Sequence, residues 1–570
     1  MTDTLTIALA QMNPTVGDIA GNVAKLRAAR AAAAKAGADL VLAPELFISG
    51  YPPEDLIKKP AFLDAIEAAV MSLAAETADG GPAVLVGCPW RPKDAQSNKN
   101  PELDNPAVGL KAGALYNAVL LLDQGRVAAV RAKVDLPNYG VFDEKRLFTA
   151  GPLPGPINMR GVRIGAPICE DIWTPDVVEC LAESGAELLL VPNGSPFEAG
   201  KYDTRIQLAV ARTVESDLPI AYLNQVCGQD ELVFDGASFV MNADRSLAVQ
   251  MPGFAEHLEV TRWSRTNQGW RCAPGTLAPP PDGLPSIYQA LILGLRDYVG
   301  KNRFPGVLLG LSGGIDSALT AAVAADALGP ERVHAVMMPS RYTSRESLDD
   351  AEAVAKLLGI RYETIAIEPA VAAFTGMLAP AFAGRKPDLT EENLQSRIRG
   401  VTLMALSNKL GAMVVSTGNK SEMSTGYATL YGDMCGGYAL LKDVYKTTVF
   451  ALCRWRNQAL PPGALGPAGR VMPERVITKP PTAELREGQT DEASLGAYSQ
   501  LDQVLEGLIE REESVEQIAA RGFDRAYVQR VWRMLDLAEY KRRQAPPGVK
   551  ITARSLSRDR RYPITNAFRG

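Results

Sequence analysis

The stretch VLLGLSGGIDSALT, residues 307–320, joins an apolar run to the start of a helix through a short loop of glycine and serine. The apolar run predicts a buried strand, and the residues after the loop predict a helix. A loop of this kind presents several backbone N–H groups and a helix N-terminus, which together bind phosphate. The pattern GxxxxGK[ST] is absent, which excludes the P-loop kinases and GTPases. The stretch therefore predicts an α/β domain that holds a nucleotide.

Apolar runs alternate with helical patterns on both sides of this stretch. Before it, buried strands are predicted at 4–10, 38–43, 83–87, 162–168, 186–191 and 220–224, helices at 22–36 and 203–216, and a hairpin at 115–134 that turns at 123–125. After it, a strand is predicted at 412–416 and long helices at 391–411 and 494–521. No internal repeat is visible in the sequence, so the two halves of the chain are expected to have different functions.

The length of 570 residues exceeds one ordinary hydrophobic core, so at least two domains are expected. The clearest boundary is RTNQGWRCAPGTLAPPPDGLPS (265–286), which is dense in proline and glycine and predicts a linker. The expected domains are therefore 1–264 and 287–570. The polar segment KDAQSNKNPELDNP (93–106) predicts a mobile loop insertion.

The composition narrows the class of protein. Hydrophobic residues make up 46% and charged residues 22%, which is typical of globular proteins. The net charge of −5, without a long basic run, predicts no nucleic-acid partner. No apolar stretch reaches the length of a membrane span, and MTDTLTIALAQMNP has no basic region of a secretory signal. Seven scattered cysteines without a CxxC pair fit a reducing cytosol and offer no structural zinc site. A cytoplasmic protein is expected.

A possible nucleophile is Cys169 in PICEDIWTPD (167–176), at the end of a predicted strand. The chain has only two histidines, and neither lies in a motif, so another base must take the thiol proton. A glutamate can act as that base, while a lysine favours the thiolate and stabilises an oxyanion. Glu45 and Lys133 also follow predicted strands, and strand ends converge at one edge of a sheet. Taken singly, Cys169 would be a buried core cysteine, Glu45 a loop carboxylate and Lys133 a solvated lysine at the end of a strand.

Three longer motifs favour a catalytic role. PELFISGYPPEDL, KVDLPNYGVFDE and PICEDIW resemble the nitrilase superfamily over roughly residues 4–262. Members of that superfamily hydrolyse carbon–nitrogen bonds with a Glu–Lys–Cys triad on an α-β-β-α sandwich. The resemblance makes Glu45 the general base, Lys133 the oxyanion and orientation group, and Cys169 the acylated nucleophile.

The same resemblance implies roles for further residues. The backbone N–H of Glu170 would complete the oxyanion hole, and Glu144 matches a second glutamate near the triad. KxxLPNYGVFDE and CEDIW are similar to the glutaminase branch, in which Tyr139, Ser195 and Lys201 would bind the amino-acid end of glutamine. The insertion at 93–106 departs from the family pattern.

The motif SGGxDS in the stretch 307–320 is the phosphate-loop signature of ATP pyrophosphatases, which split ATP between its α and β phosphates. The chain also resembles the NAD synthetase family, whose C-terminal domain is a Rossmann-like parallel sheet. The matching segments are MPSRYTSRESLDDAEAVA (338–355), ENLQSRIRG (392–400), STGNKSEMSTGYATLYGD (416–433) and KPPTAELREGQTDE (479–492). With the N-terminal half, the resemblance is to the glutamine-dependent members. The segment TAELREGQTDEASLGAY lacks the family's usual prolines, at Glu487 and Gly496.

This resemblance implies a set of binding residues. ATP would be bound by Gly310, Leu311, Ser312, Gly313, Gly314, Ile315, Asp316, Ser317 and Thr417. Mg²⁺, a hard ion suited to carboxylates and phosphate oxygens, would be held by Asp316 and Glu422. The dinucleotide deamido-NAD would contact Asn393, Glu422, Tyr427, Ala428, Thr429, Leu430 and Lys541.

The implied activity is that of a carbon–nitrogen ligase with three small-molecule substrates: L-glutamine, ATP and deamido-NAD. Glutamine is hydrolysed at Cys169, the nicotinate carboxylate attacks the α-phosphate of ATP to give an adenylate and diphosphate, and ammonia displaces AMP. Ammonia is nucleophilic only when unprotonated, which favours a shielded passage between the two sites. The resemblance also implies a homo-oligomer.

Three alternative functions compete with this interpretation. A tRNA-modifying ATP pyrophosphatase would share SGGxDS but should carry basic patches or sulfur-carrying cysteines, and neither is evident. Other amidotransferases use a Cys–His–Glu glutaminase or an N-terminal cysteine, whereas this chain has few histidines and Thr2. A non-catalytic nucleotide sensor would need a broken triad or loop.

Overall fold

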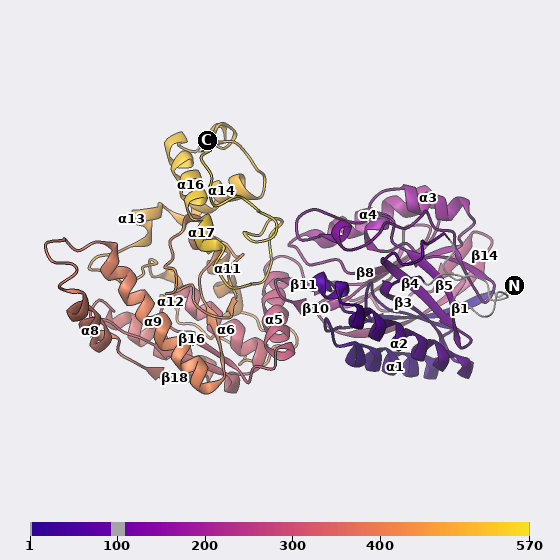
Figure 1. Ribbon diagram of the computed structural model, residues 1–570, viewed down its shortest axis with the longest axis horizontal. Coiled ribbons are helices and arrows are strands. Elements are labelled where there is room, and N and C mark those ends of the chain that lie inside the picture. Colours follow the sequence, from indigo (N-terminus) through magenta and orange to yellow (C-terminus); the bar gives the residue numbers. More distant parts are fainter. Residues whose placement is uncertain (1–2, 93–108, 569–570) are drawn as a thin grey trace. The chain divides into compact units, whose positions relative to one another are not determined.

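The computed structural model describes residues 3–92 and 109–568, which fold into two compact units (Figure 1). Unit 1 comprises Met1–Gln229 and Val233–Pro281, and unit 2 comprises Asp230–Leu232 and Asp282–Gly570. The predicted loop at 93–106 lies outside the described residues. Within them, no helix has both the length and the apolar character needed to cross a membrane.

Unit 1 contains two large sheets and a small one. The first sheet has the strand order β15 (Gly269–Cys272), β14 (His257–Thr266), β1 (Thr4–Gln11), β2 (Leu40–Leu42), β3 (Ala83–Trp90), β4 (Tyr116–Asp123) and β5 (Arg126–Ala132). The second has the order β13 (Leu247–Gln250), β12 (Phe239–Met241), β9 (Ile220–Asn224), β8 (Leu188–Asn193), β7 (Val162–Gly165) and β6 (Ile157–Met159). The small sheet pairs β10 (Val226–Gln229) with β11 (Leu232–Asp235).

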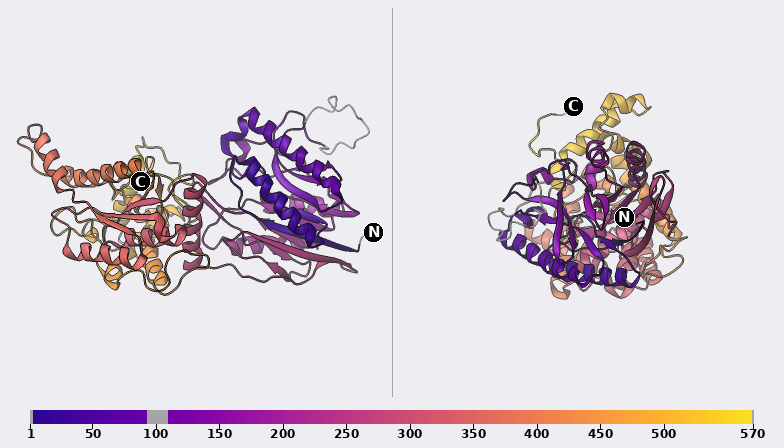
Figure 2. Two further views of the ribbon diagram at one scale, coloured as in Figure 1. Left: turned by 90° about the horizontal axis from the view of Figure 1, so that it is seen from below. Right: turned by 90° about the vertical axis from the view of Figure 1, so that its right-hand side faces the viewer.

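The two large sheets pack face to face because their strands are apolar on both faces. In β1, Ile7 and Leu9 enter the core between the sheets, while Ala8 and Ala10 enter the core beneath helices. The helices α1 (Ile19–Lys35) and α2 (Pro60–Glu76) cover the first sheet, and α3 (Asp176–Glu183) and α4 (Lys201–Ser216) cover the second. Figure 2 (left) shows the indigo helices α1 and α2 along one face of the strands. The predicted α-β-β-α sandwich is confirmed.

Unit 2 is built on a fully parallel five-stranded sheet. Its strand order is β18 (Arg361–Thr364), β17 (Val333–Met337), β16 (Val307–Gly310), β19 (Met413–Ser416) and β20 (Tyr438–Ala439). β16 comes first in the sequence of this sheet and is central in it, and later strands are added on both sides. In open parallel sheets, ligands bind beyond the carboxyl ends of the strands at this reversal of order. The predicted Rossmann-like fold is confirmed.

The helices of unit 2 surround this sheet and form a second, C-terminal core. The first group is α5 (Leu284–Lys301), α6 (Ile315–Leu328), α7 (Arg345–Leu358), α8 (Glu368–Leu378), α9 (Leu389–Leu410), α10 (Lys420–Thr425), α11 (Lys446–Arg456) and α12 (Glu474–Thr478). The second group, which shares the C-terminal core, is α13 (Asp491–Leu495), α14 (Tyr498–Ile509), α15 (Val515–Ala520), α16 (Arg525–Leu537) and α17 (Glu539–Arg542).

Two predicted elements differ from the structure. Residues 265–272 were assigned to a linker but form the end of β14 and the strand β15, because Trp270 and Cys272 are buried between the sheets. The single long helix expected at 494–521 is three helices. Gly496 has φ +83°, which ends α13, and Ser514 caps the start of α15 with its side chain.

Candidate active sites

The first candidate site lies where three strands of unit 1 end. Glu45 follows β2, Lys133 follows β5, and Cys169 begins a short 3₁₀ turn after β7. All three side chains are buried. Cys169 has φ +47°, a conformation that non-glycine residues rarely adopt and that is often found at functional sites. The strand ends thus bring together residues that are far apart in the chain.

Lys133 is paired with two carboxylates. Its Nζ lies 2.8 Å from Glu45 Oε1 and 3.0 Å from Glu144 Oε1. Asn117 Nδ2 donates to Glu45 Oε1 at 2.7 Å, the N–H of Gly194 donates to Glu45 Oε2 at 2.8 Å, and Tyr51 Oη donates to Glu144. Glu45 is therefore held in one orientation through both of its oxygens. Neither Asn117 nor Tyr51 was singled out from the sequence.

The electrostatics of this cluster keep Cys169 protonated at rest. Burial, followed by the charge of Glu45, raises the pKa of the Cys169 thiol well above its usual range, although Lys133 opposes the shift. Burial alone would lower the pKa of Lys133, but Glu144 and Glu45 raise it well above its ordinary value. Burial raises the pKa of Glu144, while Lys133 lowers it. A neutral thiol beside a carboxylate requires proton transfer during nucleophilic attack rather than before it.

Asp171 joins the segments that carry Lys133 and Cys169. Its Oδ1 accepts from the N–H groups of Val134 and Asp135, at 2.9 and 2.8 Å, and its Oδ2 accepts from the N–H of Ile168 at 2.9 Å. Burial raises the pKa of this carboxyl to about 7, despite these hydrogen bonds. Asp171 was not singled out from the sequence, although it lies only two residues beyond the cysteine.

The candidate glutamine-binding residues border this cluster. Tyr139 is half exposed, and its hydroxyl donates to Glu170 Oε1 at 2.8 Å. These two residues line one pocket together with Trp173. Lys201 Nζ lies 6.0 Å from the centroid of the Trp173 ring. The side chain of Glu170, for which only the backbone had been considered, adds a carboxylate suited to an ammonium group.

Ser195 is fixed from both sides. Its N–H donates to Asn224 Oδ1 at 2.9 Å, and its hydroxyl accepts from Arg205 Nε at 3.1 Å. Arg205 is buried and also pairs with Asp235 at 2.8 Å. Ser195 therefore has a defined place near Gly194, the residue whose N–H contacts Glu45.

The second candidate site lies at the carboxyl end of β16. The loop 311–314 connects β16 to α6, and Ser317 Oγ accepts from the N–H of Ser312 at 3.2 Å. At Gly313, φ is +81° and a Cβ atom would lie 2.2 Å from the carbonyl oxygen of Ser347. Only glycine fits there. All nine predicted ATP-binding residues line one pocket, together with Glu422 and Lys446.

Two carboxylates and one ammonium meet at this pocket. Asp316 Oδ1 accepts from Asn419 Nδ2 at 2.9 Å, and Asp316 Oδ2 contacts Lys446 Nζ, which also lies 3.6 Å from Glu422 Oε1. Burial, followed by the charge of Asp316, raises the pKa of Glu422 to about 8. Lys446 and Asn419 were not singled out from the sequence. Two carboxylates that line one pocket with the glycine- and serine-rich loop 311–314 have the donor chemistry that Mg²⁺ prefers.

The candidate deamido-NAD residues surround the end of α10. Thr429 Oγ1 donates to Asn393 Oδ1 at 3.0 Å, and Lys541 Nζ donates to the carbonyl oxygens of Gly426 and Ala428, at 2.7 and 2.6 Å. Tyr427 and Ala428 line the same pocket as the phosphate loop. Leu430 packs against the C-terminal core and accepts from Arg397 through its carbonyl oxygen.

Comparisons with known proteins match both units. The model of the NAD synthase family matches residues 287–545, and that of the carbon-nitrogen hydrolase family matches residues 6–265. The glutamine-dependent NAD(+) synthetase of Rhodobacter capsulatus is 51% identical over 569 residues, covering 100% of both chains. That of Xanthomonas campestris pv. campestris is 46% identical and covers 100% of this chain and 98% of the relative. The solved structure of the Acinetobacter baumannii enzyme in complex with ADP is 42% identical, with a TM-score of 0.76 and 99% coverage of both chains.

Proposed function

Because the chain belongs to the glutamine-dependent NAD(+) synthetases, we propose that the Cys169 site releases ammonia from glutamine and that the Asp316 site uses it. The enzyme is a carbon–nitrogen ligase: it converts deamido-NAD to NAD at the expense of ATP, which yields AMP and diphosphate. The single observation that carries this conclusion is identity along the full length of the chain, through both catalytic units. A tRNA-modifying enzyme is not supported.

In the glutaminase reaction, Glu45 takes the proton from Cys169 as the sulfur attacks the side-chain amide of glutamine. Lys133, with the backbone N–H of Glu170, stabilises the oxyanion of the tetrahedral intermediate. Glu45 then returns the proton to the leaving ammonia, and water hydrolyses the thioester with Glu45 again as base. The hydrogen bonds to Glu45 support this role. Lys133 and Asn117 donate to Oε1 and the N–H of Gly194 donates to Oε2, so three of the four lone-pair directions are occupied and one on Oε2 remains for the thiol proton.

The amino-acid end of glutamine carries a positive and a negative group. We assign Glu170 and Tyr139 to the α-ammonium group, since a carboxylate and a phenol oxygen meet there. Lys201 and Ser195 are assigned to the α-carboxylate. These assignments rest on charge complementarity with the residues that border the Cys169 cluster.

In the synthetase reaction, the nicotinate carboxylate attacks the α-phosphate of ATP and ammonia then displaces AMP. The N–H groups of the loop 311–314 and Lys446 bind the phosphates. Mg²⁺, held by Asp316 and Glu422, would neutralise charge on the phosphate oxygens. Adenylation is needed because a free carboxylate resists attack by ammonia. Tyr427 and Asn393, near the end of α10, would orient the dinucleotide.

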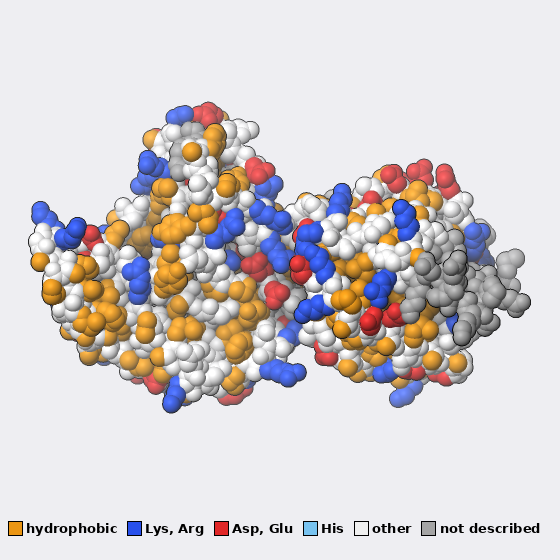
Figure 3. Space-filling view, in the orientation of Figure 1, with side chains coloured by type: hydrophobic (Ala, Val, Ile, Leu, Met, Phe, Trp, Pro, Cys, Tyr) orange, Lys and Arg blue, Asp and Glu red, His pale blue; other side chains and the backbone are white. Residues whose placement is uncertain are grey.

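We further propose that the enzyme is cytoplasmic and forms a homo-oligomer. A cytoplasmic location is supported by seven free cysteines, since reducing compartments keep thiols unpaired. A homo-oligomer is supported by apolar side chains of α8 and α9 that remain exposed in unit 2, which Figure 3 shows as orange patches. They are Phe374, Met377, Leu389, Val401, Met404 and Leu410.

One assay tests the proposed function. The purified chain should form NAD from deamido-NAD and ATP with glutamine, and again with ammonium in place of glutamine. AMP should appear in equal amount with each nitrogen source. No NAD with either source would refute the proposal, and NAD with ammonium alone would refute the glutaminase assignment.

A further inference from the structure

Residues 419–422, at the start of α10, contact two different parts of unit 2. Asn419, which caps the helix, and Glu422 form a capping box, and Asn419 also contacts Asp316. Lys420 and Ser421, between them, are fully buried and bond to other parts of unit 2. The contacts of Lys420 and Ser421 therefore determine the positions of Asn419 and Glu422 relative to the loop 311–314.

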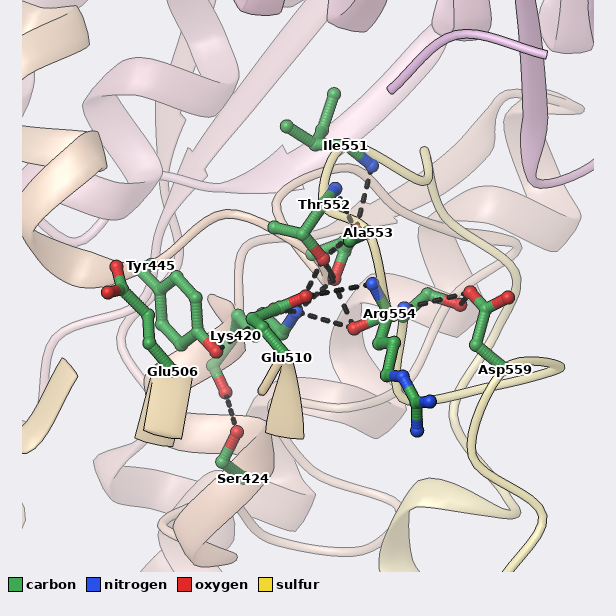
Figure 4. A network of polar contacts seen from close by, with 12 residues as sticks. Lys420, Ser424, Tyr445, Glu506, Glu510, Ile551, Thr552, Ala553, Arg554 and Asp559 are labelled. Carbon is green, nitrogen blue, oxygen red and sulfur yellow. Dashed lines mark hydrogen bonds and ion pairs between the residues drawn. The ribbon is translucent and has the colours of Figure 1, made fainter. Parts of the chain in front are cut away.

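The ammonium of Lys420 is the centre of a buried polar cluster (Figure 4). Its Nζ lies 2.8 Å from Asp443 Oδ1 and 2.5 Å from Glu510 Oε1. It also donates to Thr552 Oγ1 at 2.6 Å and to the carbonyl oxygen of Arg554 at 2.7 Å. We call these five residues the Lys420 cluster.

The same two carboxylates bind the backbone of the C-terminal segment 551–554. Asp443 Oδ2 accepts from the N–H groups of Ile551 and Thr552, at 2.7 and 2.8 Å. Glu510 Oε2 accepts from the N–H of Arg554 at 2.8 Å. Lys420 thus joins α10 to a segment that lies 132 residues further along the chain, at Thr552. Figure 4 shows this segment passing directly over the ammonium.

A buried ammonium with two carboxylates is weak evidence of net stabilisation, because desolvation of the charges offsets their attraction. Removal of one partner is nevertheless strongly destabilising, because it leaves a buried charge uncompensated, and this favours the arrangement in which every charge is paired. Here the arrangement that is favoured includes the placement of the Asp316–Glu422 pair.

We propose that Lys420 is a positioning residue for amidation: it holds Asn419 and Glu422 in place by binding the C-terminal segment 551–554, which makes that segment part of the synthetase site. This inference rests on the proposed function of Asp316 and Glu422 in using ATP. It predicts that loosening the segment weakens the use of ATP without affecting glutamine hydrolysis.

The main test uses two hydroxyl variants that lie three residues apart in the C-terminal part of the chain. Thr552→Val removes the hydroxyl that accepts from Lys420 and donates to Asp443 but leaves every charge in place. Ser555→Ala is the matched control, because the buried hydroxyl of Ser555 contacts Ser557 and Asp559 among the described residues, and neither Lys420 nor Asp443. With ammonium as nitrogen source, Thr552→Val should raise the KM for ATP several-fold, whereas Ser555→Ala should not.

A charge variant extends the test. Lys420→Met should raise the KM for ATP by about ten-fold or more, since small displacements of a binding group can cost up to ~100-fold in rate. Arg456→Met is its control, because Arg456 forms an equally buried ion pair with Asp326, at 2.6 Å. Both variants should lower the melting temperature, but only Lys420→Met should change the KM. If Lys420→Met does not fold, Thr552→Val alone decides.

Hydrogen exchange separates this inference from the proposed function. In the enzyme without substrates, Thr552→Val should speed exchange of the amides at 419–426 as well as at 551–554, and Ser555→Ala should leave 419–426 unchanged. Unchanged exchange at 419–426 together with an unchanged KM for ATP would overturn the proposal. Failure of the wild-type enzyme to make NAD would instead overturn the proposed function. The basal rate of glutamine hydrolysis should be the same in all variants.

Discussion

At the scale of single residues, the glutaminase site depends on how one ammonium is shared. Glu45 and Glu144 both bind Lys133, while Cys169 stays protonated because it is buried beside Glu45. The three residues proposed for catalysis therefore act as one unit, and removal of any one leaves the others misplaced or wrongly charged.

The first prediction concerns Cys169→Ala. The variant should make no NAD from glutamine but should still make NAD from high concentrations of ammonium, because the nucleophile serves only glutamine. Glu45→Ala and Lys133→Ala should do the same, and the losses in double variants should not add. Rates with both nitrogen sources and a melting curve are the measurements. Equal loss with both sources, together with a lower melting temperature, would assign Cys169 a purely structural role.

The second prediction concerns the pH dependence that Asp171 confers. Its pKa is raised to about 7 in the folded enzyme, against an ordinary value of 3.8. The folded state therefore binds the proton more tightly than the unfolded chain. Protonation of Asp171 contributes fully to the free energy of unfolding below about pH 4, and this contribution is lost as the pH rises through about 7. Asp171→Asn should remove that dependence. Melting temperatures from pH 5 to pH 8 should fall less steeply in the variant than in the wild type.

The same substitution should weaken glutamine use. Either orientation of the new amide places an NH₂ group against a backbone N–H that now donates to the carboxylate. The segments of Lys133 and Cys169 should separate, and the glutamine-dependent rate should fall by about ten-fold or more. The ammonium-dependent rate is the internal control. A glutamine-dependent rate equal to that of the wild type would show that Asp171 does not position these segments.

At the scale of elements, the proposed synthetase site centres on a turn between a strand and a helix. The loop between β16 and α6 approaches α7 so closely that a Cβ atom added at Gly313 would lie 2.2 Å from the carbonyl oxygen of Ser347. Packing of this kind makes the loop rigid before ATP arrives, and a rigid set of N–H donors binds phosphate with little loss of entropy.

The third prediction tests this packing. Gly313→Ala should nearly abolish NAD formation with ammonium, because its Cβ would lie 2.2 Å from Ser347 and the backbone at φ +81° disfavours alanine. Gly359→Ala, at φ +69° with no atom within 4 Å of the added Cβ, controls for backbone strain alone. It should cost stability but leave the KM for ATP unchanged. A Gly313→Ala enzyme with an ordinary KM for ATP would contradict the rigid loop.

Much of this architecture could be predicted because it depends on local patterns. Apolar runs bounded by turns located most strands of the two large sheets of unit 1, and β16 and β19 in unit 2, whereas the buried strand β17 was not predicted. The turn between β16 and α6 follows from its own glycine- and serine-rich sequence. The break at Gly496 within 494–521 was missed, since helical periodicity continues across it and only tertiary packing decides between one helix and three. The start of the expected linker was also wrong: residues 269–272 form the strand β15, because Trp270 is buried in the core between the sheets.

Some site residues could not be predicted from the sequence for a different reason. Asn117 contacts Glu45 across 72 residues, and Lys446 contacts Asp316 across 130 residues. Each lies inside an ordinary strand or helix with no motif of its own, so only the fold brings it to the site. Glu45, Lys133 and Cys169 could be proposed because each follows an apolar run and lies in a long family motif.

At the scale of the whole molecule, the two activities are carried by separate units. Each unit has its own hydrophobic cores, and each site is built from residues of one unit. The chemistry of one site should therefore survive the loss of the other.

The fourth prediction is the counterpart of the first. Asp316→Asn should abolish NAD formation from both glutamine and ammonium, because this carboxylate contacts Lys446 and Asn419 in the pocket proposed to bind ATP. Glutamine hydrolysis, followed as glutamate released, should persist. NAD formation from ammonium at the wild-type rate would remove Asp316 from the proposed site.

The sharing of Lys133 between two carboxylates also bears on what happens after the reaction. Hydrolysis turns the side-chain amide of glutamine into the carboxylate of glutamate, and this new negative charge forms beside Glu45 and Glu144. Among the described residues, the ammonium in contact with that pair is that of Lys133, which is already engaged by both, so the product meets net repulsion where the neutral amide met none. Glutamate should consequently leave quickly and inhibit weakly, which would let the enzyme work in a medium rich in its own product.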